Sequence, residues 1–127
     1  MLVFLEQCFR DFRHTGAFLP SSNVLARTMT RSMRTARGPQ RVLEVGPGTG
    51  PFTRALLKLL KPGDELHIVE INPNFARLIE HRFLAPFRAK HPAISVSLHC
   101  ESIETVKLEG TFDHIICGLP FNNFPPA

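Results

Sequence analysis

The most informative segment of this chain is Glu44-Val45-Gly46-Pro47-Gly48-Thr49-Gly50. Its glycines let the backbone turn sharply and come close to a ligand, because no Cβ stands in the way. The apolar run just before it predicts a short buried strand at 41–45, and the periodic apolar residues after it predict a helix at 52–60. A glycine loop that leaves a strand and opens a helix is the arrangement in which parallel α/β sheets bind nucleotides.

Strands and helices alternate along the rest of the chain. Further strands are predicted at 65–70, 94–100 and 112–117, and further helices at 2–13, at about 23–35 and from Asn72-Pro73 to about 83. The segment 84–92, which holds two prolines, fits neither pattern. This order predicts an α/β fold, a Rossmann-like doubly wound parallel sheet preceded by N-terminal helices.

A carboxylate follows the second predicted strand. Glu70 lies 20 residues after Gly50, where nucleotide-binding sheets place an acidic residue that accepts hydrogen bonds from ribose hydroxyls. Taken alone, Glu70 would be interpreted as a solvated carboxylate at a strand end. The glycine loop, 70–71 and 117–121 all follow predicted strands, however, and the carboxyl ends of parallel strands meet at one edge of a sheet. We therefore expect these three stretches to form one site.

The spacing of the glycines separates two cofactor classes. A nicotinamide dinucleotide loop needs a small third residue for close packing of helix on strand, and Pro51 stands at that position. The Glu-x-Gly-x-Gly-x-Gly order instead resembles motif I of the class I methyltransferases. A glycine-rich turn that binds no ligand is the alternative.

The resemblance to class I methyltransferases implies S-adenosyl-L-methionine as the cofactor and S-adenosyl-L-homocysteine as the product. It also assigns the cofactor-binding residues. These are Glu44, near the methionyl ammonium, Gly46, Pro47, Gly48, Thr49 and Gly50 around it, Glu70 and Ile71 after the second strand, and Glu101 and Ser102 near the adenine amino group.

The residues after the fourth predicted strand indicate the methyl acceptor. Gly118-Leu119-Pro120-Phe121 resembles the Asn-Leu-Pro-Tyr/Phe block of the rRNA adenine dimethylases, with Gly118 in place of Asn. Gly118 can offer only its carbonyl, so a planar exocyclic amine would lose one orienting hydrogen bond, which disfavours adenine. With the block at 15–22 and the glycine loop, the chain resembles the bacterial phospholipid N-methyltransferases, which convert phosphatidylethanolamine toward phosphatidylcholine. This resemblance implies that Gly118, Leu119, Pro120 and Phe121 form the catalytic acceptor site.

Two other functions stay open at this point. One is an RNA methyltransferase similar to the rRNA adenine dimethylases, and the other is a non-catalytic fragment that binds the cofactor. No side chain stands out as a general base, and His114, within a predicted strand, is interpreted as structural. The cysteines Cys8, Cys100 and Cys117 are widely spaced and match no zinc pattern, so no metal site is expected.

Positive charge is concentrated near the N-terminus. The first 41 residues hold seven Arg against two acidic residues, whereas the rest of the chain is nearly balanced. We therefore divide the chain into a helical segment, 1–40, that faces a membrane or the substrate, and a cofactor-binding half-domain, 41–127. In the helix predicted at 2–13, apolar residues recur beside Arg10 and Arg13, which predicts contact with an anionic or ethanolamine phospholipid surface. Packing of this helix over the cofactor cleft, or on the missing C-terminal half, is an equal alternative. In the helix predicted at about 23–35, the stripe Arg27, Arg31 and Arg34 suits lipid phosphates and nucleic-acid phosphates equally well.

The length of the chain leaves room for only part of a class I methyltransferase sheet. Such a sheet has more strands than the four predicted here, so we expect the half-domain to be truncated after the fourth strand. Its exposed edge predicts self-association. No apolar run reaches the ~18 residues of a membrane-spanning helix, and no secretory signal is recognised. We expect a cytoplasmic protein that binds peripherally at the inner face of the membrane.

Overall fold

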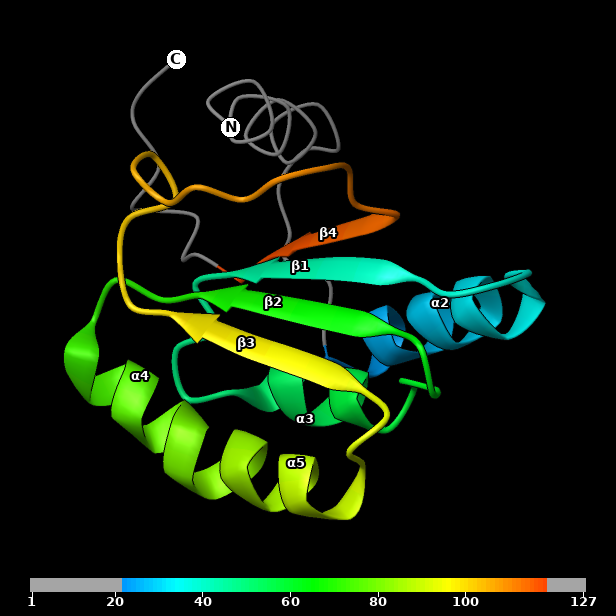
Figure 1. Cartoon of the computed structure of the whole chain (residues 1–127), viewed down its shortest axis with the longest axis horizontal. Coiled ribbons are helices and arrows are strands. Elements are labelled where there is room, and N and C mark those ends of the chain that lie inside the picture. The colour runs from blue at the N-terminus through cyan, green and yellow to red at the C-terminus, as the bar shows by residue number, and fades with distance from the viewer. Residues whose placement is uncertain (1–21, 119–127) are drawn as a thin grey trace.

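The computed structural model describes residues 22–118, in which helices and strands alternate (Figure 1). The helices are α2 (Ser22–Thr35), α3 (Pro51–Leu57), α4 (Pro73–Ile79), the π-helical turn η1 (Glu80–Leu84) and α5 (Ala85–Lys90). The strands are β1 (Arg41–Val45), β2 (Glu65–Val69), β3 (Ser95–His99) and β4 (His114–Cys117). The helix predicted at 2–13 and the residues Leu119, Pro120 and Phe121 lie outside the described part of the chain.

The four strands form one parallel sheet in the order β3-β2-β1-β4. β1 pairs with both β2 and β4, and the register sets Val45 beside Val69 and Cys117. β2 also pairs with β3, where Val69 lies beside His99. The carboxyl ends of these strands therefore lie at one edge of the sheet (Figure 1). The predicted Rossmann-like parallel sheet is confirmed.

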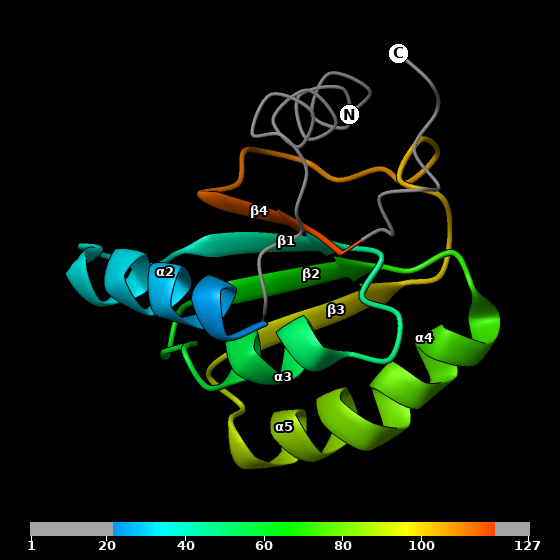
Figure 2. The same ribbon diagram turned by 180° about the vertical axis from the view of Figure 1, so that it is seen from behind.

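The described helices cover one face of the sheet, and the main hydrophobic core lies between them (Figures 1 and 2). This core includes Met33 of α2, Leu56 of α3, Ile79 of α4 and Ile68 of β2. The segment 100–113 packs on the opposite face, where Val106 joins a smaller buried cluster. A doubly wound sheet carries helices on both faces, whereas this connection between β3 and β4 contains a turn and no helix.

The segment 84–92, which fits neither pattern in the sequence, is helical as far as Lys90. Pro86 has no N–H to donate to the carbonyl four residues earlier, and the π turn η1 lies directly before α5. In that turn the N–H of Ala85 bonds to the carbonyl of Glu80, five residues earlier. The helix stops before Pro92 because a proline disfavours helical angles in the residue preceding it. His91 accordingly has φ −132° and ψ 68°.

Two further observations concern surfaces. Within residues 22–118, no helix has the length and apolar character needed to cross a bilayer. β3 and β4 are the outer strands of the described sheet, and self-association through a sheet edge stays a prediction.

Candidate functional site

The glycine loop leaves β1 and enters α3 at the carboxyl edge of the sheet (Figure 1). Gly46, Gly48 and Gly50 have positive φ angles of 68°, 60° and 93°, in the left-handed region that disfavours side chains. The N–H of Gly46 donates to the carbonyl of Val69 at 2.8 Å, which ties the loop to the end of β2. A Cβ on Gly48 would meet no atom within 4 Å. The loop is therefore open at Gly48, where a ligand can approach the backbone.

Glu70 follows β2 and is only 5% exposed. One carboxylate oxygen accepts a hydrogen bond from the N–H of Gly48 and the other from the N–H of Asn72, each at 2.9 Å. The side chain thus joins the glycine loop to the start of α4, which Asn72 caps. Each carboxylate oxygen carries two lone pairs, so Glu70 keeps the capacity to accept from hydroxyl groups. Its assignment to ribose stays a prediction, as does that of Ile71, which follows it and is 65% exposed.

Glu44 lies in β1 and is fully buried. The hydroxyl of Thr53, in α3, donates to its Oε1 at 2.5 Å, whereas Oε2 has no hydrogen-bond partner among the described residues. Burial raises the pKa of Glu44 to about 7, while the Thr53 hydrogen bond lowers it and the charge of Glu70 raises it further. Buried polar atoms rarely lack partners. Sequence reasoning missed Thr53, because a threonine in the first turn of a helix carries no pattern of its own.

These features fit a ligand that carries an ammonium group and hydroxyl groups. An ammonium beside Oε2 would complete the hydrogen bonding of Glu44 and favour its ionised form. Hydroxyl groups can donate to Glu70, and the open side of Gly48 permits close approach. S-adenosylmethionine carries both kinds of group, on its methionyl and ribose parts. Among residues 22–118, no three His, Cys, Asp or Glu side chains are placed to hold a metal ion.

Glu101 and Ser102 follow β3 at the same edge of the sheet and form a local turn. The hydroxyl of Thr105 donates to the exposed carboxylate of Glu101 at 3.2 Å. The Ser102 hydroxyl accepts from the N–H of Glu104 at 3.1 Å. The structure therefore brings both residues to the predicted edge, but their side chains serve the turn. Contact with an adenine amino group stays a prediction.

Gly118 follows β4 and packs directly against the glycine loop. Its N–H donates to the carbonyl of Val45 at 2.7 Å. A Cβ at this position would stand 2.8 Å from the carbonyl oxygen of Gly46, closer than real Cβ atoms come to backbone oxygens. A side chain at position 118 would therefore clash with the glycine loop. The absence of one also leaves only the backbone carbonyl to contact an acceptor amine. The other predicted acceptor residues, Leu119, Pro120 and Phe121, lie outside the described residues.

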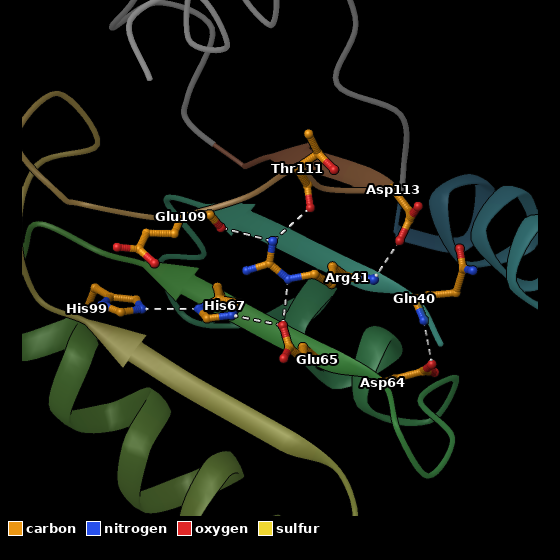
Figure 3. Close-up of polar contacts among 9 residues, drawn as sticks. All are labelled: Gln40, Arg41, Asp64, Glu65, His67, His99, Glu109, Thr111 and Asp113. Atoms are coloured by element: carbon orange, nitrogen blue, oxygen red, sulfur yellow. Dashed lines mark hydrogen bonds and ion pairs between the residues drawn. The ribbon is translucent and has the colours of Figure 1, made fainter. Parts of the chain in front are cut away.

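A second polar cluster crosses the sheet face on which segment 100–113 packs (Figure 3). Nε of Arg41 donates to Oε2 of Glu65 at 2.6 Å, and Nε2 of His67 lies 3.5 Å from the same oxygen. Nδ1 of His67 and Nε2 of His99 share a hydrogen bond of 3.3 Å. Burial lowers the pKa of His67, and its contact with Glu65 opposes that shift. The sequence did not reveal this polar cluster, because its residues come from three different strands.

His114 lies at the opposite end of β4 from the glycine loop. Its Nε2 is 3.1 Å from Oε1 of Gln40, and its strand partner is Val42, near the start of β1. This position agrees with the structural interpretation of His114.

The chain is similar to known methyltransferases in sequence. Residues 42–127 match a protein family described as "Methyltransferase domain". The chain is 29% identical over 125 residues to the ornithine lipid N-methyltransferase of Singulisphaera acidiphila, a match that covers 97% of this chain and 63% of that protein. The chain thus spans less than two thirds of the length of this curated relative.

Solved structures share the fold. An amino pentose methyltransferase from Micromonospora echinaspora, solved with bound SAM, matches with a TM-score of 0.56 and 24% identity, over 93% of this chain and 44% of that chain. Coclaurine N-methyltransferase, solved with N-methylheliamine and SAH, matches with a TM-score of 0.54 and 18% identity, over 79% of this chain and 30% of that chain.

Proposed function

Since the chain belongs to the methyltransferase domain family, we propose that it binds S-adenosylmethionine and methylates the amine of a membrane lipid. The cofactor assignment is supported by the buried Glu44, whose Oε2 has no hydrogen-bond partner among the described residues. It is also supported by the glycine loop, which a hydrogen bond to Glu70 holds in place. The choice of a lipid amine as the acceptor is supported by the similarity to a lipid N-methyltransferase along 97% of the chain.

The bound cofactor supplies an electrophilic methyl group on a sulfonium, which is a good leaving group. In this proposal Glu44 holds the methionyl ammonium, while Glu70 holds the loop and accepts hydrogen bonds from the ribose. The backbone carbonyl of Gly118 orients the acceptor amine, with Leu119, Pro120 and Phe121 completing the acceptor site. Positioning dominates the rate, because the two reacting groups need only be aligned.

The acceptor must be a neutral amine when it reacts. A primary amine with an ordinary pKa of about 10 has to lose a proton first. Within residues 22–118, the half-buried His114 is already engaged with Gln40 at the far end of β4, so it does not serve as that base. In this proposal the proton passes to solvent water before the transfer, and the carbonyl of Gly118 then accepts a hydrogen bond from the neutral amine, which orients its lone pair toward the methyl group.

Phosphatidylethanolamine-type lipids and ornithine lipid are the two proposed acceptors. The first follows from the resemblance to phospholipid N-methyltransferases and the second from the named relative. The rival acceptor is an RNA adenine. Gly118 argues against it, since it offers no side-chain oxygen to a planar amine and the packing on Gly46 leaves no room for one.

Transfer of a labelled methyl group tests the proposal. The chain is incubated with methyl-labelled S-adenosylmethionine and, separately, vesicles with phosphatidylethanolamine, vesicles with ornithine lipid, and RNA. We expect label in lipid, reduced in Glu70→Gln and unchanged in Glu104→Gln, a matched change at an exposed turn residue. Label found in RNA alone would establish the rival. Cofactor binding without any transfer would identify a non-catalytic fragment.

A further inference from the structure

A cleft of about 480 Å³ opens beside the glycine loop, where the start of α3 meets η1. Its lining comes from the loop, from α3 and from η1: Thr49, Gly50, Pro51, Arg54, Arg82 and Phe83. Gly50 allows these elements to approach, because a Cβ there would stand 2.7 Å from the side chains of Ile79 and Phe83. Thr49 and Gly50, which the resemblance assigns to the cofactor, form one side of the cleft, whereas the Glu44 and Glu70 carboxylates do not line it.

Two arginines from different elements line the cleft. Arg54 belongs to α3 and Arg82 to η1, and both are exposed. Among the described residues, the ion pairs of arginine are Arg41 with Glu65 and Arg88 with Glu80. Neither Arg54 nor Arg82 has a carboxylate partner in that part of the chain. Two cations that line one cleft without an acidic partner favour binding of an anion there.

The whole layer of helices is basic. The helices α2 to α5, with η1, hold eight Lys and Arg against one acidic residue, Glu80, which Arg88 already neutralises. The segment 100–113 on the opposite face holds four acidic residues and one Lys. The helix layer is therefore basic and the segment 100–113 acidic, and Figures 1 and 2 show these two layers on opposite faces of the sheet. Such a distribution orients the helix layer toward an anionic surface.

We infer that the Arg54–Arg82 cleft binds the phosphate group of an anionic phospholipid, which docks the helix layer on the bilayer. Guanidinium groups match the geometry of phosphate oxygens and can form paired hydrogen bonds to them. Phe83 and Pro51 give the same cleft apolar walls, which suit the less polar part of a lipid headgroup. The inference rests on the proposed lipid function, and it adds a binding site that is separate from the amine acceptor.

Binding to vesicles tests the cleft with a matched control. The whole chain is sedimented with phosphatidylcholine vesicles that contain or lack phosphatidylglycerol. Arg54→Gln with Arg82→Gln is compared with Arg34→Gln with Arg37→Gln, two exposed arginines that remove the same charge outside the cleft. Two arginines at a membrane surface correspond to roughly a thirtyfold change in affinity for the anionic vesicles. We expect that loss in the cleft pair and less than about a threefold loss in the control pair.

Several outcomes would overturn the inference. Equal losses in the two pairs would show that diffuse charge, and not the cleft, binds the membrane. Loss of affinity for a short RNA with unchanged vesicle binding would show that the cleft serves nucleic acid. If the Gln pair lowers the melting temperature, Arg54→Lys with Arg82→Lys carries the test, because it keeps both charges but not the planar forks. Wild-type affinity in that Lys pair would contradict phosphate recognition by guanidinium.

Two further measurements complete the test. Competition with inorganic phosphate shows whether the cleft recognises phosphate itself, and a methyl-transfer assay tests the proposed function independently of the cleft. Loss of vesicle binding when inorganic phosphate is added would support recognition of the phosphate itself. Vesicle binding at the wild-type level in the Arg54→Gln, Arg82→Gln variant would contradict it. Methyl transfer by the wild-type chain is measured apart from binding. Transfer to lipid with no role for the cleft refutes this inference alone, whereas cleft-dependent vesicle binding without transfer refutes the lipid methylation alone.

Discussion

The backbone N–H of Gly48 donates a 2.9 Å hydrogen bond to the carboxylate of Glu70, which joins the middle of the glycine loop to the end of β2. The other oxygen of Glu70 accepts from Asn72 at the start of α4. One side chain therefore sets the position of the loop and of a helix start. A ligand bound at this edge would meet a loop that is already held in place.

Replacing Glu70 with Ala should weaken binding of S-adenosylhomocysteine. The variant loses charge-assisted hydrogen bonds that are worth about 1.5–3 kcal/mol, which corresponds to roughly ten- to a hundredfold in affinity. Isothermal titration calorimetry measures the change. Glu104→Ala, at an exposed position, is the control, and an affinity equal to that of the control would rule out a role for Glu70 in cofactor binding.

Glu44 should make stability fall as pH rises. Its pKa is about 7 in the folded chain and 4.5 as the ordinary value, so between these values the unfolded chain has released a proton that the folded chain keeps. The free energy of unfolding then decreases across this window, by on the order of 3 kcal/mol in all, and the effect is constant above pH 7 or so. Below about pH 4.5 both states are protonated and the group has no effect.

Urea unfolding at about pH 5 and about pH 8 measures this dependence in the wild type and in Glu44→Gln. The Gln side chain cannot ionise, so the variant should lose this part of the pH dependence while its amide oxygen can still accept from Thr53. An identical fall in both proteins would mean that Glu44 is not the titrating group.

Gly118→Ala should disturb the glycine loop. The new Cβ would press on the carbonyl oxygen of Gly46, and overpacking of this kind costs about 1–3 kcal/mol. We expect a lower free energy of unfolding together with weaker binding of S-adenosylhomocysteine. Gly38→Ala is the control, since a Cβ there meets no atom within 4 Å and introduces only backbone strain. The packing argument fails if the two variants bind the ligand equally well.

Arg41 should fasten the segment that covers the sheet face opposite the helices (Figure 3). Its Nη1 donates to the carbonyls of Glu109 and Thr111 at 3.0 and 2.8 Å, and its guanidinium lies over the ring of Phe112. Arg41→Ala should cost about 1–2 kcal/mol, toward the low end for charged hydrogen bonds because the side chain is 30% exposed. Hydrogen exchange should accelerate at the amide of Asp113, which ends this segment and donates to the Arg41 carbonyl at 2.8 Å. Unchanged exchange there would show that Arg41 does not hold this segment.

The helix predicted at 2–13 lies outside the described residues, and its contact with the membrane is tested separately. Phe9→Asp with Phe12→Asp should reduce binding to anionic vesicles, since each ring contributes up to about 1.5–3 kcal/mol when buried. Sedimentation with vesicles measures this in parallel with the cleft variants. Undiminished binding would remove the helix as a membrane contact, and loss of the folded state would show that it packs in the core.

Much of the fold follows from local sequence. The strand at 41–45 was predicted with the bounds that the structure shows, because an apolar run followed by a glycine loop is a property of adjacent residues. Asn72 and Pro73 likewise predicted the start of α4. The helical segment around Pro86 was missed, because a π turn that accommodates a proline depends on backbone geometry that no residue pattern encodes.

The parallel sheet, the glycine loop and the sheet edge that carries Glu44, Glu70 and Gly118 could all be predicted from residue patterns. The contacts that each of these residues makes could not. The tertiary structure sets Thr53 on Glu44, Gly46 against Gly118, and Arg54 in one cleft with Arg82. The difference lies in the range over which the interactions act. Periodicity and turn chemistry act between neighbours along the chain, whereas burial, hydrogen bonding and charge act between groups that packing alone brings within a few ångströms.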